Sequence, residues 1–325
     1  MPVVTYLDAI HDGLREEMER DDRVFMIGED IGKFGGAFKV TDGLQQQFGA
    51  DRVIDAPISE TAIVGAAAGA AHMGLRPVCE MQFIDFLSCA YSIITNYVAT
   101  ARYRADLKTP IVIRGPSGGY VRGGPFHSQN PEAAYLHTPG LKIVAPATVR
   151  DAKGLIKSAI RDDDPVLYFE HKYLYRRLKA ELPDGEEILT PIGVARIARE
   201  GKDLTIVTYS AMVHKALEAA ERLSHDGVSV EVLDLRTLLP IDDAAIVASV
   251  KKTNRVLIVH EDTRTGGLAG EITARINEQC FEWLDAPVRR VCAHDVPLPF
   301  APALEDFVLP QTDDIVAAAR WMVRY

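Results

Sequence analysis

The first candidate for chemistry is an acid at the start of a segment rich in alanine and glycine. The stretch ISETAIVGAAAGAAHMG places Ser59 at a helix N-cap, Glu60 in the first turn and Gly74 at the C-terminal stop. A carboxylate held there can work as an acid, a base or a hydrogen-bond acceptor. It can equally be a first-turn acid that the helix dipole stabilises, and the spacing leaves both interpretations open. The small side chains of this helix allow another helix or chain to approach closely.

A glycine-rich stretch, RGPSGGYVRGGPFHSQNPEA, is chemically dense for a surface loop. Its polar residues are Arg114, Arg122, His127, Ser128 and Gln129. The glycines match neither a Walker phosphate loop nor the G-x-G-x-x-G fingerprint, so the stretch does not indicate nucleotide binding. Taken alone, His127 is either a site residue or an ordinary loop histidine.

The sequence RDDDP, residues 161–165, brings three carboxylates together where a helix gives way to a strand. Acids at a helix C-terminus repel the exposed carbonyl groups, and a bound cation would relieve that repulsion. Solvated surface acids are the alternative, since three neighbouring acids do not by themselves identify a metal.

These residues sit in a chain that alternates short β-rich runs with helical patterns, as a parallel sheet between helices does. The expected strands of the first half are residues 24–28, 77–83, 109–114, 141–145 and 166–170. A charged stretch containing LPDGEE follows, and the second half reads as a compact β-α-β-α-β unit. We therefore predict two α/β domains, residues 1–175 and 192–325, joined by a linker at 176–191.

Composition narrows the classes of partner. The net charge of −10, without any run of Lys or Arg, excludes nucleic acid and an anionic membrane as expected partners. The longest mostly apolar stretch, residues 62–75, is too short to span a bilayer and is expected to be a buried helix. The N-terminus carries no export or transit pattern, and the four cysteines show no metal spacing and read as reduced core residues. A cytoplasmic location is the expectation.

Long motifs across both halves carry a resemblance to a known family. They include GEDIGKFGGAFKVTDGL, IDAPISETAIVGAAAG, GLRPVCEMQF, HSQNPEAAYLHTPGLKIVAPAT, EVLDLRTLLPID and HEDTRTGGLAGEI. Together they resemble the beta subunits of the first component of 2-oxo acid dehydrogenase complexes. The resemblance implies a pyrimidine-binding thiamine-diphosphate domain, followed by a transketolase C-terminal-like α/β domain, in an alpha2-beta2 heterotetramer.

The resemblance also implies roles for individual residues. Glu60 matches the glutamate that bonds a ring nitrogen of the cofactor's aminopyrimidine, and so favours the tautomer that removes the thiazolium proton. Ile58, Gln82 and Phe86 match positions that line the aminopyrimidine, although relatives often have Tyr where Phe86 stands. His127 matches the histidine that faces the reacting carbon, where it orients the substrate carboxylate or assists acyl transfer to lipoamide.

The resemblance also bears on two ion-binding sites, one for potassium and one for the Mg²⁺ that holds the diphosphate. A potassium site in some members matches the backbone carbonyls of Ile111, Ala159 and Ile160 with Asp162 and Asp164. Thiamine enzymes usually hold the diphosphate through Mg²⁺ and a Gly-Asp-Gly motif followed by Asn, and this sequence has no such motif. An alpha subunit is therefore expected to supply that half of the site and most of the Mg²⁺ ligands.

The motifs HSQNPEA and EHKYLYR resemble branched-chain members more than pyruvate members. The expected reaction is oxidative decarboxylation of a branched-chain 2-oxo acid such as 3-methyl-2-oxobutanoate, with acyl transfer to the lipoyl domain of a dihydrolipoyl acyltransferase core. A pyruvate or acetoin dehydrogenase beta subunit is the first alternative. A split transketolase-type enzyme is less favoured because the His127 segment offers few groups for a sugar phosphate. A noncatalytic docking scaffold is less favoured because Glu60 and His127 are both present.

Overall fold

The chain forms two compact units in a computed structural model that describes residues 2–183 and 185–325. The first unit runs to Ser117 and resumes from Ala134 to Ile192, and the second comprises Gly118–Ala133 and Gly193–Tyr325. Met1, in the predicted first domain, and Asp184, in the predicted linker, lie outside the described residues.

The sequence-based division differs from these units in two places. It sets residues 176–191 apart as a linker, whereas the first unit continues to Ile192. It assigns Gly118–Ala133 to the first domain, whereas in the structure this segment packs with the second unit. The physical reason is a set of long-range bonds: its backbone and Arg122 bond to Glu261 and Glu305. The segment containing His127 is thus built into the second unit, although it lies between two secondary-structure elements of the first.

A parallel sheet forms the centre of the first unit. Its strands are β2 (Val24–Gly28), β3 (Val53–Asp55), β4 (Arg76–Glu80), β5 (Val112–Ser117), β6 (Lys142–Val144) and β7 (Val166–His171). They lie in the order β6-β7-β5-β4-β2-β3, and every neighbouring pair is parallel. Strands β5 and β7 are buried along their whole length, as expected when helices cover both faces of a parallel sheet. The prediction of a parallel sheet between helices is confirmed.

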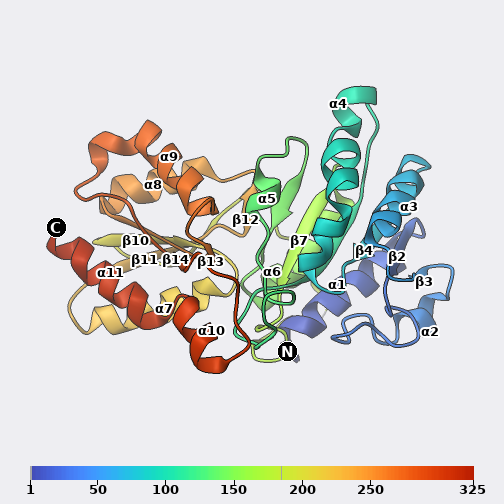
Figure 1. Cartoon of the computed structure of the whole chain (residues 1–325), viewed down its shortest axis with the longest axis horizontal. Helices are drawn as coiled ribbons and strands as arrows, with labels where there is room; N and C mark the ends of the chain where they lie inside the picture. Colours follow the sequence, from blue (N-terminus) through green and yellow to red (C-terminus); the bar gives the residue numbers. More distant parts are fainter. Residues whose placement is uncertain (1, 184) are drawn as a thin grey trace. The chain divides into compact units, whose positions relative to one another are not determined.

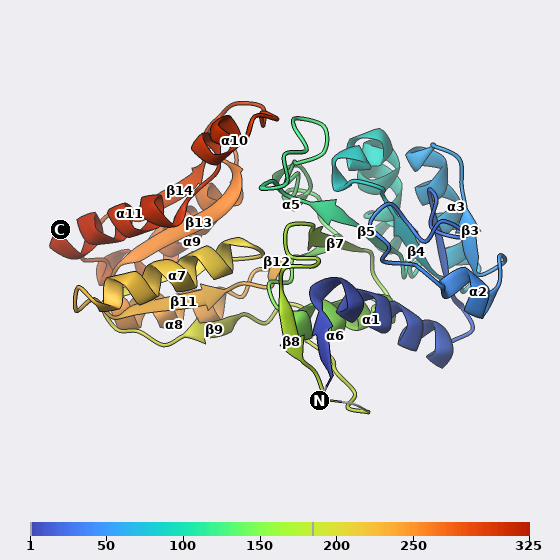
Figure 2. The same cartoon turned by 90° about the horizontal axis from the view of Figure 1, so that it is seen from below.

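Helices cover both faces of this sheet (Figure 2). Helices α1 (Tyr6–Arg20) and α6 (Val149–Arg161) pack together on one face, and α3 (Glu60–His72) packs with η1 (Ile84–Ala90) and η2 (Ile93–Val98) on the other. The remaining short helices are α2 (Leu44–Phe48), α4 (Ala101–Ala105) and α5 (Ala133–Leu136). None of the helices within the described ranges 2–183 and 185–325 has the length and apolar character to cross a bilayer.

Helix α3 begins at Glu60, as the sequence predicts, but its start differs in detail. The Ser59 hydroxyl caps no helical N–H and instead donates to the Pro57 carbonyl at 2.9 Å. Gly74 takes a left-handed φ of 95° and ends the helix. The expectation of a buried helix is wrong for one face. That face carries small residues, and no described part of this chain covers it. The exposed positions within the helix are Thr61, Ala62, Ala66 and Gly69.

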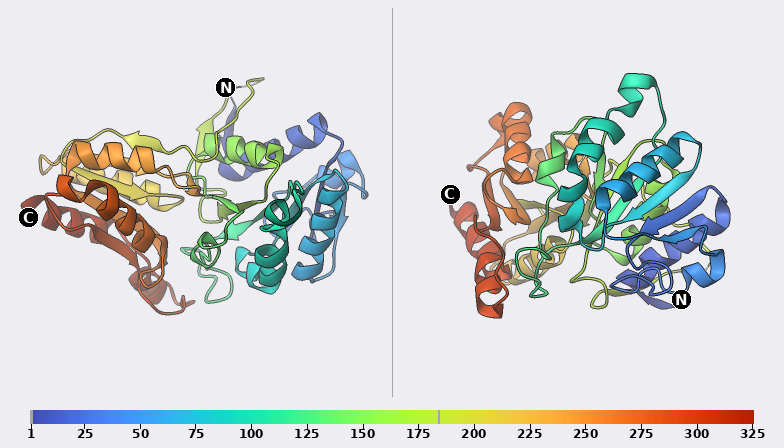
Figure 3. Two further views of the ribbon diagram at one scale, coloured as in Figure 1. Left: turned by 90° about the horizontal axis from the view of Figure 1, so that it is seen from above. Right: turned by 45° about the vertical axis from the view of Figure 1, so that its right-hand side comes forward.

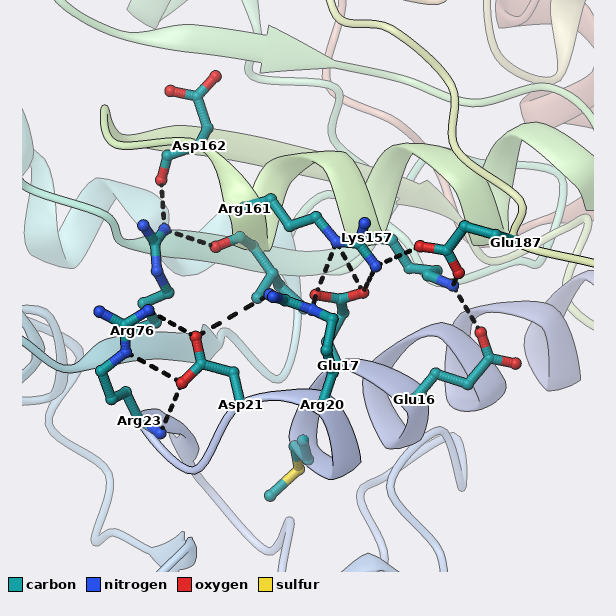
Figure 4. Close-up of polar contacts among 12 residues, drawn as sticks. Glu16, Glu17, Arg20, Asp21, Arg23, Arg76, Lys157, Arg161, Asp162 and Glu187 are labelled. Atoms are coloured by element: carbon teal, nitrogen blue, oxygen red, sulfur yellow. Dashed lines mark hydrogen bonds and ion pairs between the residues drawn. The ribbon is translucent and has the colours of Figure 1, made fainter.

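Ion pairs join α1, α6 and the predicted linker (Figure 4). Lys157, 1% exposed, reaches Glu16 and Glu187 at 2.7 Å each. Arg161 binds the buried Glu17 with two of its nitrogens and also contacts Glu187. Strand β8 (Lys179–Glu181) pairs antiparallel with β1 (Val3–Thr5), and the two lie side by side in Figure 3. The linker segment is therefore fastened to the first unit.

The second unit is a mixed sheet with helices on both faces (Figure 1). Its strands are β9 (Arg196–Arg199), β10 (Leu204–Thr208), β11 (Val230–Asp234), β13 (Val256–Thr263) and β14 (Arg289–Ala293). They lie in the order β14-β13-β10-β11-β9, with only β9 antiparallel to its neighbour. Its other elements are α7 (Met212–Ser224), β12 (Thr237–Leu239), α8 (Asp243–Thr253), α9 (Leu268–Cys280), η3 (Phe281–Trp283), α10 (Pro302–Val308) and α11 (Thr312–Arg324). Helices α8 and α9 lie on one face, and α7 and α11 on the other, so the predicted β-α-β-α-β unit is confirmed.

All four cysteines are free, as predicted, but only part of the set is in the core. Cys79 and Cys280 are buried, and Cys292 is half-buried. Cys89 is exposed, so the expectation that every cysteine is a core residue is wrong at that position.

Candidate functional site

Acidic and polar residues gather at the carboxyl edge of β2, β3 and β4. Glu29 and Asp30 follow β2 directly, Glu60 opens the helix after β3, and Gln82 follows β4. Because these strands are parallel neighbours, their carboxyl ends meet at one edge of the sheet, which is where open α/β sheets bind ligands. The Gln82 amide lies 3.4 Å from an oxygen of Asp30, which joins the loops after β2 and β4.

Glu60 is buried without a bonding partner in the part of the chain that the structure describes. Its side chain belongs to a residue only 9% exposed, and no described residue donates a hydrogen bond to its carboxylate. Glu29, 7% exposed, lies close enough to interact with it. Burial, together with the charges of Glu60 and Asp30, raises the pKa of Glu29. A buried carboxylate normally has a partner, so Glu60 is available to a group outside this chain.

Apolar side chains occur in the same segments that follow β3 and β4. Ile58, two residues before Glu60, is 83% exposed, which is unusual for a large aliphatic side chain. The Phe86 ring is half-buried and meets Phe83 edge to face, with the ring centroids 6.1 Å apart. An edge that offers a carboxylate, an aliphatic and an aromatic side chain suits a flat heteroaromatic ring with a basic nitrogen.

A buried charge network lies behind this edge. Arg114, 1% exposed, donates to Glu80 and to both oxygens of Glu170, and the Tyr175 hydroxyl donates to Glu170 at 2.7 Å. The sequence-based predictions place Arg114 both at the end of an expected strand, 109–114, and in the glycine-rich loop; β5 instead continues to Ser117 and buries it. Although burial opposes its charge, Glu170 and Glu80 raise the pKa of Arg114. Burial also raises the pKa of Glu80, because one guanidinium cannot compensate two buried carboxylates.

The network of Arg114 supports the loop after β2 by direct packing. A Cβ on Gly28 would lie 2.9 Å from the Cβ of Glu80, and a Cβ on Gly36 would lie 3.3 Å from a Glu80 carboxylate oxygen. Gly36 also has a left-handed φ of 80°, which a larger residue adopts at a cost. The chain path that carries Glu29 and Asp30 therefore depends on Glu80.

His127 lies in the Gly118–Ala133 segment of the second unit and is half-exposed. Its backbone N–H points to the Gly124 carbonyl, 3.4 Å away, in a tight turn. The neighbouring Ser128 is buried and Gln129 is exposed. The Arg122 guanidinium of the same segment forms ion pairs with Glu305 and Asp306.

The acids of RDDDP follow α6 at the amino edge of the first sheet, the edge opposite Glu60. The two carboxylate oxygens of Asp162 accept hydrogen bonds from the Lys142 ammonium at 2.6 and 2.7 Å, and Asp164 forms an ion pair with Arg102. Asp163 receives Lys108 and Arg76, whose hydrogen bonds lower the pKa of this carboxyl. Within residues 2–183 and 185–325, no group of three or more His, Cys, Asp or Glu is arranged to hold a metal. Basic side chains therefore relieve the repulsion that the sequence assigned to a bound cation.

Several backbone carbonyl oxygens of this turn accept hydrogen bonds from N–H groups of the protein. The Ile160 and Asp162 carbonyls each accept from Arg76 at 2.9 Å. The Ile111 carbonyl accepts from the Val166 N–H at 3.0 Å, and the Ala159 carbonyl lies 3.3 Å from the Asp162 N–H.

Two family models match the chain along nearly its whole length. The transketolase pyrimidine-binding domain matches residues 3–177, and the transketolase C-terminal domain matches residues 193–315. The 2-oxoisovalerate dehydrogenase subunit beta of Bacillus subtilis (strain 168) is 49% identical, with the whole of both chains covered. The chain belongs to the beta subunits of 2-oxo acid dehydrogenase first components. It is thus part of a thiamine-diphosphate-dependent, decarboxylating dehydrogenase.

Other relatives of this beta subunit share the fold and the subunit type. The pyruvate dehydrogenase E1 component subunit beta of the same Bacillus subtilis strain is 43% identical, again over the whole of both chains. The mitochondrial pyruvate dehydrogenase E1 component subunit beta-2 of Oryza sativa subsp. japonica is 45% identical, covering 98% of this chain and 85% of the relative. A solved structure described as a split gene transketolase, inactive beta4 tetramer, superposes with a TM-score of 0.79 at 25% identity, covering 99% of this chain and 98% of the other.

In this beta subunit the structure brings part of the predicted site together. Ile58, Glu60, Gln82 and Phe86 lie at the carboxyl edge of the first sheet. The predicted potassium ligands lie at the amino edge of the same sheet, and His127 lies in the second unit. Sequence reasoning missed Glu29, whose signal was available: it is an acid directly after a buried strand, in the motif GED.

Proposed function

We propose that this beta subunit, with an alpha subunit, forms a thiamine-diphosphate site that decarboxylates a branched-chain 2-oxo acid of the 3-methyl-2-oxobutanoate type. One observation carries the proposal. Glu60, only 9% exposed, receives no hydrogen bond from any described residue on its carboxylate, and it lies two residues after the exposed Ile58. Bound thiamine diphosphate supplies a carbon nucleophile that adds to the 2-oxo group and accepts the electrons left when CO₂ departs.

Glu60 holds the aminopyrimidine by a hydrogen bond to a ring nitrogen, and this contact keeps the proton of the ring where catalysis needs it. Ile58 and Phe86 provide apolar surfaces for the ring, and Gln82 provides an amide within reach of the same edge. A carboxylate accepts a stronger hydrogen bond than a neutral group does, and Glu60 is only 9% exposed. Nothing in this role requires the diphosphate end of the cofactor to contact this chain.

His127 orients the carboxylate of the 2-oxo acid or assists transfer of the acyl group to lipoamide. An imidazole is suited to either task, since it changes charge near neutral pH and both ring nitrogens can bond. Its half-exposed position leaves it accessible to a substrate.

The alpha subunit is proposed to hold the diphosphate and Mg²⁺, because this sequence has no Gly-Asp-Gly motif followed by Asn. The exposed small residues on α3 provide a face that a second chain can approach closely. The acyl group is then passed to a lipoyl domain of a dihydrolipoyl acyltransferase core.

Substrate preference is tested by turnover of the complex of this chain with its alpha partner. We expect kcat/KM for 3-methyl-2-oxobutanoate to exceed that for pyruvate by roughly 10- to 200-fold, the range that one or two methylene groups supply in an apolar pocket. Support comes from HSQNPEA and EHKYLYR and from the higher identity to the 2-oxoisovalerate relative, 49% against 43% within one organism. An artificial electron acceptor reports turnover. A higher kcat/KM for pyruvate would keep the chemistry and reject the branched-chain assignment.

We also propose a structural potassium ion at the amino edge of the first sheet. Its ligands would be the carbonyls of Ile111, Ala159 and Ile160 with Asp162 and Asp164, oxygen donors of the kind that hard cations prefer. The acids of this turn support the proposal, while Lys142 and Arg102 compete for the two carboxylates.

The potassium proposal predicts an ion-dependent loss of stability. We expect the loss of Tm in Asp162→Ala to be about 2–4 °C larger in potassium chloride than in sodium chloride at equal ionic strength. In potassium the bound ion stabilises the native chain and the variant binds it more weakly, whereas in sodium neither chain holds an ion at this site. Thermal melting by differential scanning fluorimetry measures this effect. Asp226→Ala, which removes an exposed acid paired with Arg320 in the second unit, is the matched control and should show no difference between the salts. Equal losses for Asp162→Ala in both salts would contradict a potassium site.

A further inference from the structure

The segment Gly118–Ala133 is a loop closed at its base and built around one acid of the second unit. Its two limbs meet where the Gly118 N–H donates to the Gln129 carbonyl at 3.0 Å. His127 lies just inside this closure. The position of its imidazole therefore depends on what keeps the two limbs together.

Glu261 bridges the two limbs with a single oxygen. It lies in β13 and is 6% exposed. Its Oε1 accepts a hydrogen bond from the Gly119 backbone N–H on the first limb and another from Asn130 Nδ2, at 2.9 Å, on the second. Hydrogen bonds from neutral donors to a buried carboxylate are stronger than those between neutral groups. One side chain thus sets the spacing of the loop on both sides of His127.

Other contacts hold the first limb in an unfavourable backbone conformation. Tyr120 and Arg122 have left-handed φ values of 62° and 64°, which residues other than glycine rarely adopt. The Tyr120 hydroxyl donates to the Pro310 carbonyl at 2.7 Å, and Arg122 bonds to Glu305 and Asp306. Such a conformation persists only where surrounding contacts impose it.

The tip and the end of the loop are also fixed within the second unit. A Cβ on Gly124 would lie 2.3 Å from the Phe300 ring, so the chain packs directly against that side chain. A Cβ on Gly123 would lie 2.7 Å from the His127 carbonyl oxygen, so the turn itself is closely packed. At the end of the loop, the buried Glu132 accepts a hydrogen bond from the Tyr209 hydroxyl.

We propose that Glu261 is the positioning residue for His127, acting through the paired hydrogen bonds of its Oε1 atom to Gly119 and Asn130. Glu261 takes no part in the chemistry itself. The inference rests on the role proposed for His127, and it adds the residue that keeps this imidazole in place. It distinguishes Glu261 from Glu305 and Asp306, which hold only one limb through Arg122.

The test compares Glu261→Ala with Glu261→Gln in the complex with the alpha partner and saturating thiamine diphosphate. Glutamine keeps an amide oxygen that can accept both hydrogen bonds, whereas alanine removes the acceptor. We expect Glu261→Ala to lower kcat by roughly 10- to 100-fold, the effect of losing hydrogen bonds to one buried charged group. Glu261→Gln should remain within about threefold of the native kcat. The Kd for thiamine diphosphate should be unchanged in both. Glu221→Ala, an exposed acid paired with Arg199, is the control.

A double-mutant cycle separates positioning from a general defect. Because Glu261 acts through His127, adding Glu261→Ala to His127→Ala should lower kcat by less than about twofold more. A full additional 10- to 100-fold loss, or a Glu261→Gln variant as poor as Glu261→Ala, would overturn the inference.

Hydrogen exchange tests the loop without reference to activity. Residues 118–133 should exchange faster in Glu261→Ala than in the native chain, and at the native rate in Glu261→Gln. If exchange behaves so but His127→Ala retains full activity, the proposed role of His127 fails and the positioning role of Glu261 fails with it, although the loop contact stands. Unchanged exchange in Glu261→Ala would reject the inference whatever His127 does.

Discussion

Glu60→Gln is expected to lower kcat of the complex with the alpha partner by roughly 10²–10⁴-fold, the usual contribution of a residue that governs proton transfer. The native carboxylate is a charged acceptor, 9% exposed and without a hydrogen bond from any described residue. An amide of nearly the same size fills the space, but it is a neutral and weaker acceptor and cannot hold the proton of the cofactor ring in place. The variant should therefore assemble normally and bind the cofactor, yet turn over very slowly with any 2-oxo acid.

The alternative interpretation of Glu60, a first-turn acid stabilised by the helix dipole, predicts a different result. A dipole interaction is worth about 0.3–1 kcal/mol of stability and would leave kcat unchanged. Glu271, the first-turn acid of α9, is the matched control, because Glu271→Gln removes a helix-start charge that has no proposed catalytic role. Steady-state turnover and thermal melting on both variants separate the two interpretations. Full activity of Glu60→Gln would reject the catalytic assignment.

The sheets of both units could be predicted from the sequence because their signals are local. Buried strands such as Val24–Gly28 and Val166–His171 appear as short apolar runs, and alternation with helical patterns implies parallel pairing. The bounds of α3 could be predicted for the same reason, since Ser59 at the expected N-cap and Gly74 at the expected stop mark the two ends of the helix.

The surroundings of the candidate site residues could be predicted only in part, because contacts between residues far apart in the sequence determine them. Nothing near Gly118 in the sequence indicates that the next residues pack with the second unit, since Glu261 and Glu305 lie more than a hundred residues away. The nearness of Glu29 to Glu60 likewise follows from the pairing of β2 with β3, not from spacing along the chain. Resemblance to the family supplied Glu60 and His127, whereas only the structure showed what surrounds each of them.

The burial of Arg114 could not be foreseen, because a charged residue beside a glycine-rich stretch resembles a loop residue. The structure instead places it in the middle of the sheet, between Glu80 on β4 and Glu170 on β7. Buried charges are tolerated only when they are paired. The network therefore shows that β4, β5 and β7 were specified together, by three residues that the local pattern does not relate.

Removing Arg114 should be strongly destabilising. We expect Arg114→Met to lower the free energy of unfolding by about 3–5 kcal/mol, because the substitution leaves Glu80 and Glu170 buried without a cation. Methionine has a similar length and fills most of the space, so loss of packing contributes little. Urea unfolding followed by circular dichroism measures the loss. Replacing all three groups, as Glu80→Gln, Arg114→Met and Glu170→Gln together, should recover much of the lost stability because no buried charge is left.

The stability lost in Arg114→Met should also depend on pH, because the buried carboxylates of Glu80 and Glu170 are left without their cation. Burial already raises the pKa of Glu80 in the native chain, and removal of the guanidinium raises it further. A carboxyl whose folded pKa lies above its unfolded value costs little at low pH, where it is protonated in both states. Its cost grows as the pH rises through the unfolded pKa and up to the folded one. The difference in free energy of unfolding between the native chain and the variant should therefore be smaller at pH 5 than at pH 8. The first pH lies about one unit above the ordinary carboxyl pKa range, and the second lies well above it. A gap of equal size at both pH values would mean that the stability loss arises from packing, and that the two glutamates are not the charges that Arg114 compensates.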